Sequence, residues 1–183
     1  MIYDLQGAVM PSQRVHDTSC LALSALLATA GVVALKGALF PMAAGAAAGT
    51  LIHPDWDYAE IRGVVADLGP LKYLVKPYGW AVPHRHWISH APLVGTAGRL
   101  AYIFLPLLIL AQLLVMAGAL PFNPVWALLR TPQFWWGALG LALADTLHFA
   151  MDMAVTGVKR FVGQLLRGEN YERRTEYELP SRD

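Results

Sequence analysis

Four long apolar segments limit what this chain can fold into. They are residues 18–35, 37–52, 99–120 and 132–158 of a 183-residue chain that is 56% hydrophobic and 15% charged. A helix needs about 20 predominantly apolar residues to cross the hydrocarbon core of a bilayer. The third segment, RLAYIFLPLLILAQLLVMAGAL, meets this requirement by itself. The pattern therefore predicts an all-α polytopic membrane protein with four transmembrane helices.

The first two apolar segments are short, and only Lys36 separates them. We therefore expect a tight helical hairpin. The second segment is rich in alanine and glycine, which allow close helix packing, and an alternative is that it is half-buried in the bundle. The whole chain, 1–183, is expected to form a single membrane domain with a polar tail at residues 168–183.

Positive charges are distributed unevenly about the four predicted spans. Of the 14 lysine and arginine residues, all except Lys36 and Arg130 fall on the side that holds both termini and the loop 53–98. Lysine and arginine accumulate in the cytoplasmic loops of membrane proteins. We therefore place both termini and this loop in the cytoplasm, where the loop would contribute to a metal-binding site.

Histidine and acidic residues gather in four motifs on this predicted cytoplasmic side. The motifs are RVHD (14–17), HPDWD (53–57), PHRHWISH (83–90) and DTLHFAMD (145–152). The polar residues of the last motif are spaced three and four apart, which places them on one face of a helix. An unpaired charge in hydrocarbon costs several kcal/mol or more. This polar face is therefore expected to point into a pocket that the other motifs close.

Imidazole and carboxylate groups together suit zinc, manganese or iron. The candidates outnumber the three or four protein ligands of one zinc ion, so two divalent metal ions are predicted. Because a lone histidine at a helix end is more often a cap, His53 is left outside the set. The only cysteine, Cys20, excludes an intrachain disulfide and a cysteine-based zinc site. The predicted metal ligands are His16, Asp55, Asp57, His84, His90, His148 and Asp152.

Two further residues are predicted to act beside the metal ions. Arg85 could clamp a phosphate with two hydrogen bonds. Asp145 is expected to orient a histidine, to act as a base, or to pair with Arg85 or Arg99. A proton or ion pathway is the main alternative explanation for polar groups within a membrane helix. The outer halves of the predicted spans argue against it, because they contain no acidic residue or histidine.

In this order, the four motifs resemble those of a group of prokaryotic metal-binding membrane proteins of unknown function. The resemblance covers residues 10–160. That group is related in pattern to bacterial membrane-bound metal-dependent hydrolases. The resemblance implies that the same seven residues form the metal site, in a protein of the inner or thylakoid membrane. His53 replaces the leucine or serine that usually precedes the Pro-Asp-x-Asp unit, which leaves open an extra ligand.

Two functional hypotheses follow. The first is a membrane-embedded hydrolase that acts on a phosphoester or lipid substrate at a two-metal site on the cytoplasmic face. The second is a non-catalytic, metal-stapled subunit or assembly factor of a larger membrane complex. A metal or proton transporter is a third hypothesis. It would require a polar path through the outer half of the predicted spans, for which Gln112 and Asn123 are the only candidates in the sequence. Nucleic-acid binding is not expected, because the basic residues of the tail are interleaved with glutamates.

Overall fold

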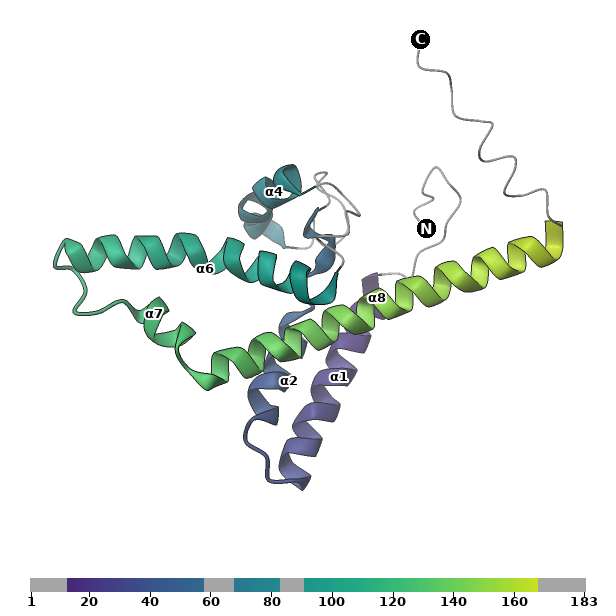
Figure 1. The fold of residues 1–183 in the computed structure, drawn as a ribbon, viewed down its shortest axis with the longest axis horizontal. Helices are drawn as coiled ribbons and strands as arrows, with labels where there is room; N and C mark the ends of the chain where they lie inside the picture. Colours follow the sequence, from purple (N-terminus) through teal and green to yellow (C-terminus); the bar gives the residue numbers. More distant parts are fainter. Residues whose placement is uncertain (1–12, 58–67, 83–90, 168–183) are drawn as a thin grey trace, which may run out of the picture. The chain divides into compact units, whose positions relative to one another are not determined.

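The computed structural model describes residues 13–57, 68–82 and 91–167, and all of its elements in these ranges are helical. The chain divides into one unit of Ser12–Phe149 and a second that combines Met1–Pro11 with Ala150–Asp183. The predicted all-α class is confirmed for the described part of the chain. The elements (Figure 1) are α1 (Gln13–Val33), α2 (Leu39–Ala48), η1 (Pro54–Asp57), η2 (Gly69–Leu71), α4 (Lys72–Ala81), α6 (Pro92–Met116), α7 (Pro124–Leu129) and α8 (Pro132–Arg167).

Among the described residues, three helices, not the predicted four, are long and apolar enough to cross a membrane. They comprise Arg14–Val33, Pro92–Met116 and Pro132–Val155. The expected second span was wrong, because α2 has only 10 residues. At 1.5 Å per residue such a helix extends about 15 Å, roughly half of a hydrocarbon core. Its buried residues, Met42, Ala43 and Ala46, agree instead with the alternative of a helix half-buried in the bundle.

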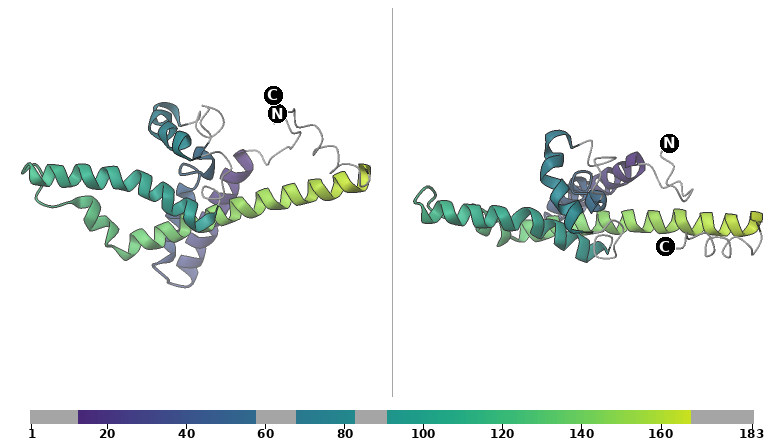
Figure 2. Two further views of the ribbon diagram at one scale, coloured as in Figure 1. Left: turned by 45° about the horizontal axis from the view of Figure 1, so that its top comes forward. Right: turned by 90° about the horizontal axis from the view of Figure 1, so that it is seen from above.

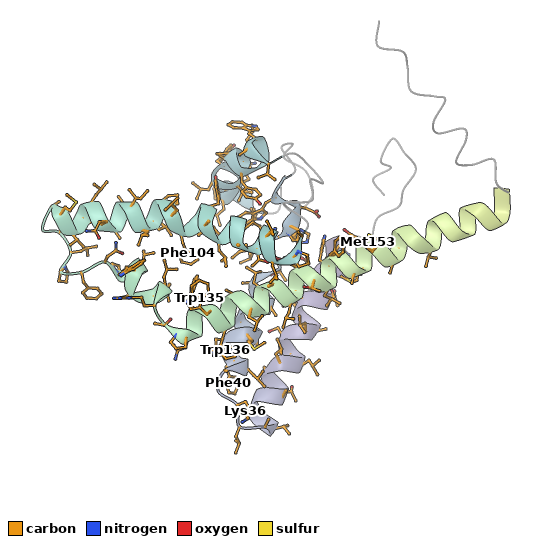
Figure 3. All side chains as sticks on the ribbon, viewed as in Figure 1. Lys36, Phe40, Phe104, Trp135, Trp136 and Met153 are labelled. Carbon is orange, nitrogen blue, oxygen red and sulfur yellow. The ribbon has the colours of Figure 1, made fainter. Side chains whose placement is uncertain are left out.

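Large apolar side chains project outward from the helices. Phe40 of α2 and Trp135 and Trp136 of α8, which are labelled in Figure 3, are exposed. Many leucine side chains of α6 are exposed as well. Extended apolar surface of this kind is uncommon on proteins that face only water. It is consistent with helices that face lipid.

The helices α1 and α2 pack against each other as an antiparallel hairpin (Figures 1 and 2). The helix α1 ends where Leu35 adopts a left-handed conformation with φ of 52°. The Lys36 amide then donates to the Gly31 carbonyl at 3.1 Å, and the Leu35 amide to the Val32 carbonyl at 3.4 Å. These two bonds satisfy carbonyl groups that the end of a helix otherwise leaves open. The turn brings the chain back along α1.

The helices α2 and α8 cross at glycines, with backbone against backbone. A Cβ atom added to Gly45 would lie 1.8 Å from the Gly137 carbonyl oxygen, and one added to Gly140 would lie 1.9 Å from that of Met42. Next to the crossing, Cys20 of α1 packs with Ala46 and Ala144 in a small buried cluster. Small residues thus bring three helices together within the unit Ser12–Phe149.

A second small core holds the segment that follows α2. Trp56 of η1 packs with Val75 and Tyr78 of α4, and Tyr78 contacts the ring of Tyr102 on α6. The Trp56 indole N–H donates to the Leu51 carbonyl at 2.8 Å. These contacts attach the HPDWD segment to α4 and, through α4, to α6.

The glycine crossing makes a testable prediction. Gly45→Ala should lower the thermal unfolding temperature in detergent, because the new Cβ forces α2 away from α8, and overpacking typically costs about 1–3 kcal/mol. Gly37→Ala is the matched control, since a Cβ at Gly37 would meet nothing within 4 Å. Equal unfolding temperatures for Gly45→Ala and the wild-type protein would contradict this packing.

Candidate metal centre

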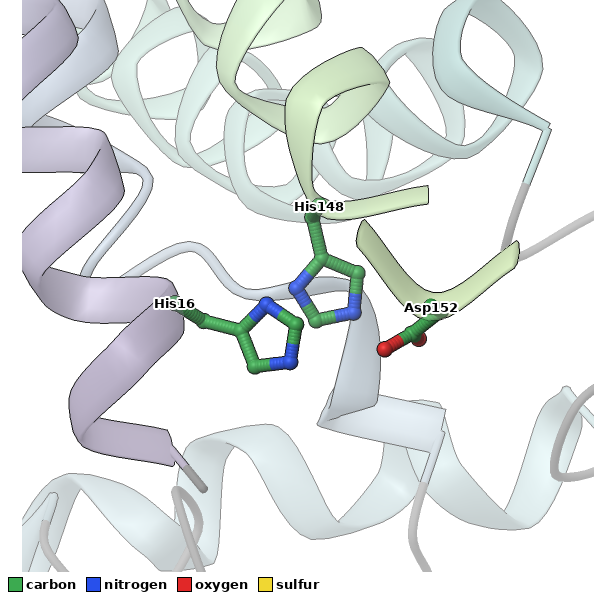
Figure 4. Close-up of side chains that lie close together, drawn as sticks. All are labelled: His16, His148 and Asp152. Carbon is green, nitrogen blue, oxygen red and sulfur yellow. The ribbon is translucent and has the colours of Figure 1, made fainter. Parts of the chain in front are cut away.

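Three imidazoles from three separate segments meet in the unit Ser12–Phe149. His16 lies in the first turns of α1, His53 lies between α2 and η1, directly before Pro54, and His148 lies on α8. The ring centroids of His16 and His148 are 3.9 Å apart, those of His53 and His148 are 4.7 Å apart, and those of His16 and His53 are 6.0 Å apart. All three side chains are buried. Figure 4 shows the His16 and His148 rings beside each other.

The hairpin and the glycine crossing explain this meeting of distant residues. The turn after Val33 directs α2 back toward the beginning of α1. The crossing at Gly45 holds the returning helix against α8. The chain after α2 therefore passes His16 and His148 when it reaches His53.

Carboxylates accompany the three imidazoles. One Asp55 oxygen, Oδ2, lies 3.3 Å from His53 Nδ1. His53, Asp55 and His148 each offer a ligand atom, and these atoms lie within 4.8 Å of one another. Asp152 follows His148 by four residues on the continuous helix α8, a spacing that places both on one helix face, and Figure 4 shows it on the next turn. The cluster thus offers both nitrogen and oxygen atoms, the kinds of ligand that suit a transition metal.

The environment of His53 favours its neutral form. Burial away from water lowers the pKa of His53 from 6.5 to about 3. The Asp55 carboxylate acts in the opposite direction, while electrostatic interactions with His148, His16 and Arg99 lower the pKa of His53 further. A neutral imidazole retains the nitrogen lone pair that binds a metal ion. At neutral pH, His53 is therefore in the form that can act as a ligand.

A buried nitrogen of His53 provides a test of whether a metal fits here. Only 1% of His53 is exposed, and its Nε2 atom has no hydrogen-bond partner among the residues that the structure describes. A buried polar atom without a partner typically costs about 1–3 kcal/mol. A metal ion bound at this nitrogen would remove that cost. The available atoms therefore fit a divalent transition metal.

A buried ion pair lies on the same helix as His148. Arg99 of α6 and Asp145 of α8 form a salt bridge, and the Thr96 hydroxyl donates to the same carboxylate oxygen. Arg99 is fully buried and Asp145 nearly so. The pair connects α6 to α8 three residues before His148. Asp145 is thus engaged by Arg99, one of the two predicted ion-pair partners, and by Thr96, whereas Arg85 lies outside the described residues.

The structure brings together some of the residues predicted from the sequence. His16, Asp55 and His148 lie in one cluster, with Asp152 on the adjoining turn of α8. The sequence prediction missed His53 as a central member, although its unusual place before the Pro-Asp-x-Asp unit was a signal. The predicted residues His84, Arg85 and His90, together with the side chain of Asp57, lie outside the described part of the chain.

Comparison with known proteins identifies one related family. The model of a family described as "Uncharacterized metal-binding protein (DUF2227)" matches residues 11–162. This range includes all of the clustered histidines and acidic residues. No curated protein and no solved structure matches the chain significantly.

The lowered pKa of His53 predicts how the stability of the metal-free protein depends on pH. Below pH 6.5 the unfolded chain takes up a proton that the folded protein accepts only near pH 3. Stability should therefore be full above pH 6.5 and should fall as the pH decreases from 6.5 toward 3. Thermal unfolding of chelator-treated protein in detergent at a series of pH values would measure this. In His53→Asn the unfolding temperature should fall less steeply as the pH decreases. Parallel plots of unfolding temperature against pH for the variant and the wild-type protein would refute the prediction.

The buried ion pair makes a second prediction. Asp145→Ala should destabilise the protein by about 3–5 kcal/mol, because it leaves the buried Arg99 guanidinium without this carboxylate. The double substitution Arg99→Met with Asp145→Leu should lower the free energy of unfolding much less, because it removes both charges. Equilibrium unfolding of both single variants and the double variant would give the coupling energy. Additive effects would mean that the pair does not act as a unit.

Proposed function

The chain belongs to this uncharacterized metal-binding family, and from that premise we propose that it is a membrane-embedded, metal-dependent hydrolase. In this proposal His16, His53 and His148 bind a divalent transition metal. The metal would be zinc in the first instance, since neutral imidazole ligands suit it well. Manganese and iron are the alternatives.

The observation that carries the proposal is the burial of three imidazoles from α1, the segment after α2, and α8 next to one another. Sets of three protein ligands are typical of catalytic zinc sites, which keep a fourth position for water. Structural zinc sites are usually closed by four protein ligands. Three protein ligands on one ion, the arrangement proposed here, would therefore favour catalysis over a purely structural role.

Hydrolysis is the reaction that such a site supports best. A divalent metal lowers the pKa of its bound water and so supplies a nucleophile at neutral pH. The three histidines would hold the ion, and the ion pair between Arg99 and Asp145 would keep α8 and therefore His148 in place. Because Asp145 is engaged by Arg99 and Thr96, we assign it a positioning role in place of the catalytic role predicted from the sequence.

The proposed substrate is a phosphoester, including a phospholipid headgroup. Three helices suited to a bilayer support a substrate that reaches the site from the membrane surface. The excess of lysine and arginine around the predicted inner loops supports a cytoplasmic location. Arg85, in the motif between α4 and α6, is the proposed phosphate-binding residue. A second metal ion would require further ligands from the predicted set, namely His84, His90 and Asp57.

A structural role for the metal is the second candidate, and a specific observation favours it. Between 11% and 33% of each candidate membrane span is buried within the structure, so the long helices share little core. A metal that joins α1, the segment after α2, and α8 would hold these elements together. The protein could then serve as a subunit or assembly factor of a membrane complex.

Metal analysis tests the proposal first. The full-length protein purified in detergent should contain about one equivalent of metal per chain if the three histidines bind a single ion, or two if the further ligands complete a second site. His148→Ala should lose this metal. Thr146→Ala is the matched control on α8, since the Thr146 hydroxyl donates to the Ala142 carbonyl of its own helix. A wild-type protein that binds no metal, even after reconstitution, would refute the proposal.

Phosphoesterase assays then separate the two candidate roles. A hydrolase should cleave bis(4-nitrophenyl) phosphate or a phospholipid in mixed micelles, and should lose this activity on chelation and regain it with zinc. A structural metal should give no turnover, but its removal should lower the unfolding temperature sharply. Metal-loaded protein that is inactive on all phosphomonoesters and phosphodiesters tested would exclude the phosphoesterase.

A further inference from the structure

The two ring nitrogens of His53 have different surroundings. Nδ1 faces Asp55, with the Asp55 amide nitrogen at 3.2 Å and the carboxylate oxygen Oδ2 at 3.3 Å. Nε2, on the opposite edge of the ring, is buried and has no hydrogen-bond partner among the described residues. The Asp55 side chain is 37% exposed, in contrast to the imidazole that it touches.

This asymmetry distinguishes two ways of binding a metal. If Nδ1 and Asp55 bound the same ion, the single proton of the neutral ring would stay on Nε2. That N–H group would then be buried without an acceptor in the described structure, which typically costs about 1–3 kcal/mol. If Nε2 binds the ion, the proton moves to Nδ1, where the Asp55 carboxylate can accept it. The second arrangement leaves neither ring nitrogen unsatisfied, and its cost is the bond that the Asp55 amide, close to the protein surface, now donates to Nδ1.

We propose that Asp55 is a positioning residue, which orients His53 so that Nε2 binds the metal, and is not itself a ligand. This inference rests on the metal binding proposed above. Outer carboxylates of this kind fix the tautomer of a ligating histidine and make it more basic. The role differs from the direct ligation that the sequence predicted for Asp55.

The proposal includes a change of tautomer when metal binds. In the metal-free protein, Nδ1 accepts the Asp55 amide proton at 3.2 Å, so the ring proton sits on Nε2. With an ion held at Nε2, that nitrogen would have given up its proton and Nδ1 would carry one, which it would donate to Asp55 Oδ2, while the Asp55 amide would give up its bond to Nδ1. The ring has one proton before and after, so His53 contributes no net proton release.

Nuclear magnetic resonance of the full-length protein in detergent tests the assignment directly. Protein labelled with ¹⁵N-histidine would be loaded with ¹¹³Cd²⁺ as the metal probe. The His53 signals would be identified by their absence in His53→Gln. We expect ¹¹³Cd–¹⁵N coupling at His53 Nε2 and a protonated Nδ1. Coupling at Nδ1 would overturn the proposal while leaving metal binding intact, and the absence of bound cadmium and zinc would overturn both.

Substitutions at Asp55 provide a readout that does not depend on activity. Asp55→Asn keeps an oxygen that can accept from Nδ1, so it should retain the full zinc stoichiometry with affinity reduced by about 10–100-fold. Asp55→Ala should lower the zinc affinity further than Asp55→Asn does. Asp55→Glu should bind zinc more tightly than Asp55→Ala, because it keeps a carboxylate. Thr50→Ala is the control, because the Thr50 hydroxyl bonds to the Ala47 carbonyl within its own turn.

A direct ligand would behave differently in this series. Asp55→Asn would then change the visible spectrum of the Co²⁺-loaded protein, because one oxygen ligand would be lost from the coordination sphere. We expect that spectrum to match the wild-type spectrum in Asp55→Asn and to change in His53→Gln. A changed spectrum in Asp55→Asn, or a loss of stoichiometry equal to that of His53→Gln, would overturn the proposal.

Discussion

The cost of placing polar groups inside an apolar bundle governs this structure. Arg99 and Asp145 are buried in helices whose other residues are mostly apolar, so each is tolerable only because the other is present. Their pairing fixes α6 against α8 close to His148. The positive charge of Arg99 also lowers the pKa of His53, which helps to keep that imidazole neutral. One ion pair thus influences both the packing of the helices and the chemical state of the histidine cluster.

The short length of α2 has a consequence for the site. From Val33 back to His16, α1 rises about 25 Å, whereas α2 extends about 15 Å. The turn at residues 49–52 continues the return and leaves His53 beside His16. The helix α2 and this turn together thus cover most of the length of α1, and they end at a buried imidazole.

The sequence predicted those features that depend on local spacing. The intervals of three and four residues between Asp145, His148 and Asp152 place them on one face of a helix whatever the tertiary structure. The apolar runs of α6 and α8 are long enough to predict membrane-spanning helices. The residues 37–52 were misassigned because alanine-rich and glycine-rich composition is shared by membrane spans and by short helices buried against neighbours. His53 was undervalued because its significance comes from His16 and His148, which are distant in sequence and become neighbours only through the hairpin and the glycine crossing.

A catalytic metal and a structural metal would both stabilise the fold of this protein. In the described structure, a small cluster of Cys20, Ala46 and Ala144 and the glycine crossing join α1, α2 and α8. The positions of the three imidazoles therefore depend on small packing surfaces that a bound metal would reinforce. Metal affinity and folding free energy are then linked, because an ion that binds only the assembled cluster stabilises that assembly. A catalytic ion in such a bundle would therefore also act as a cross-link. Turnover, and not stability alone, is the property that separates the two accounts.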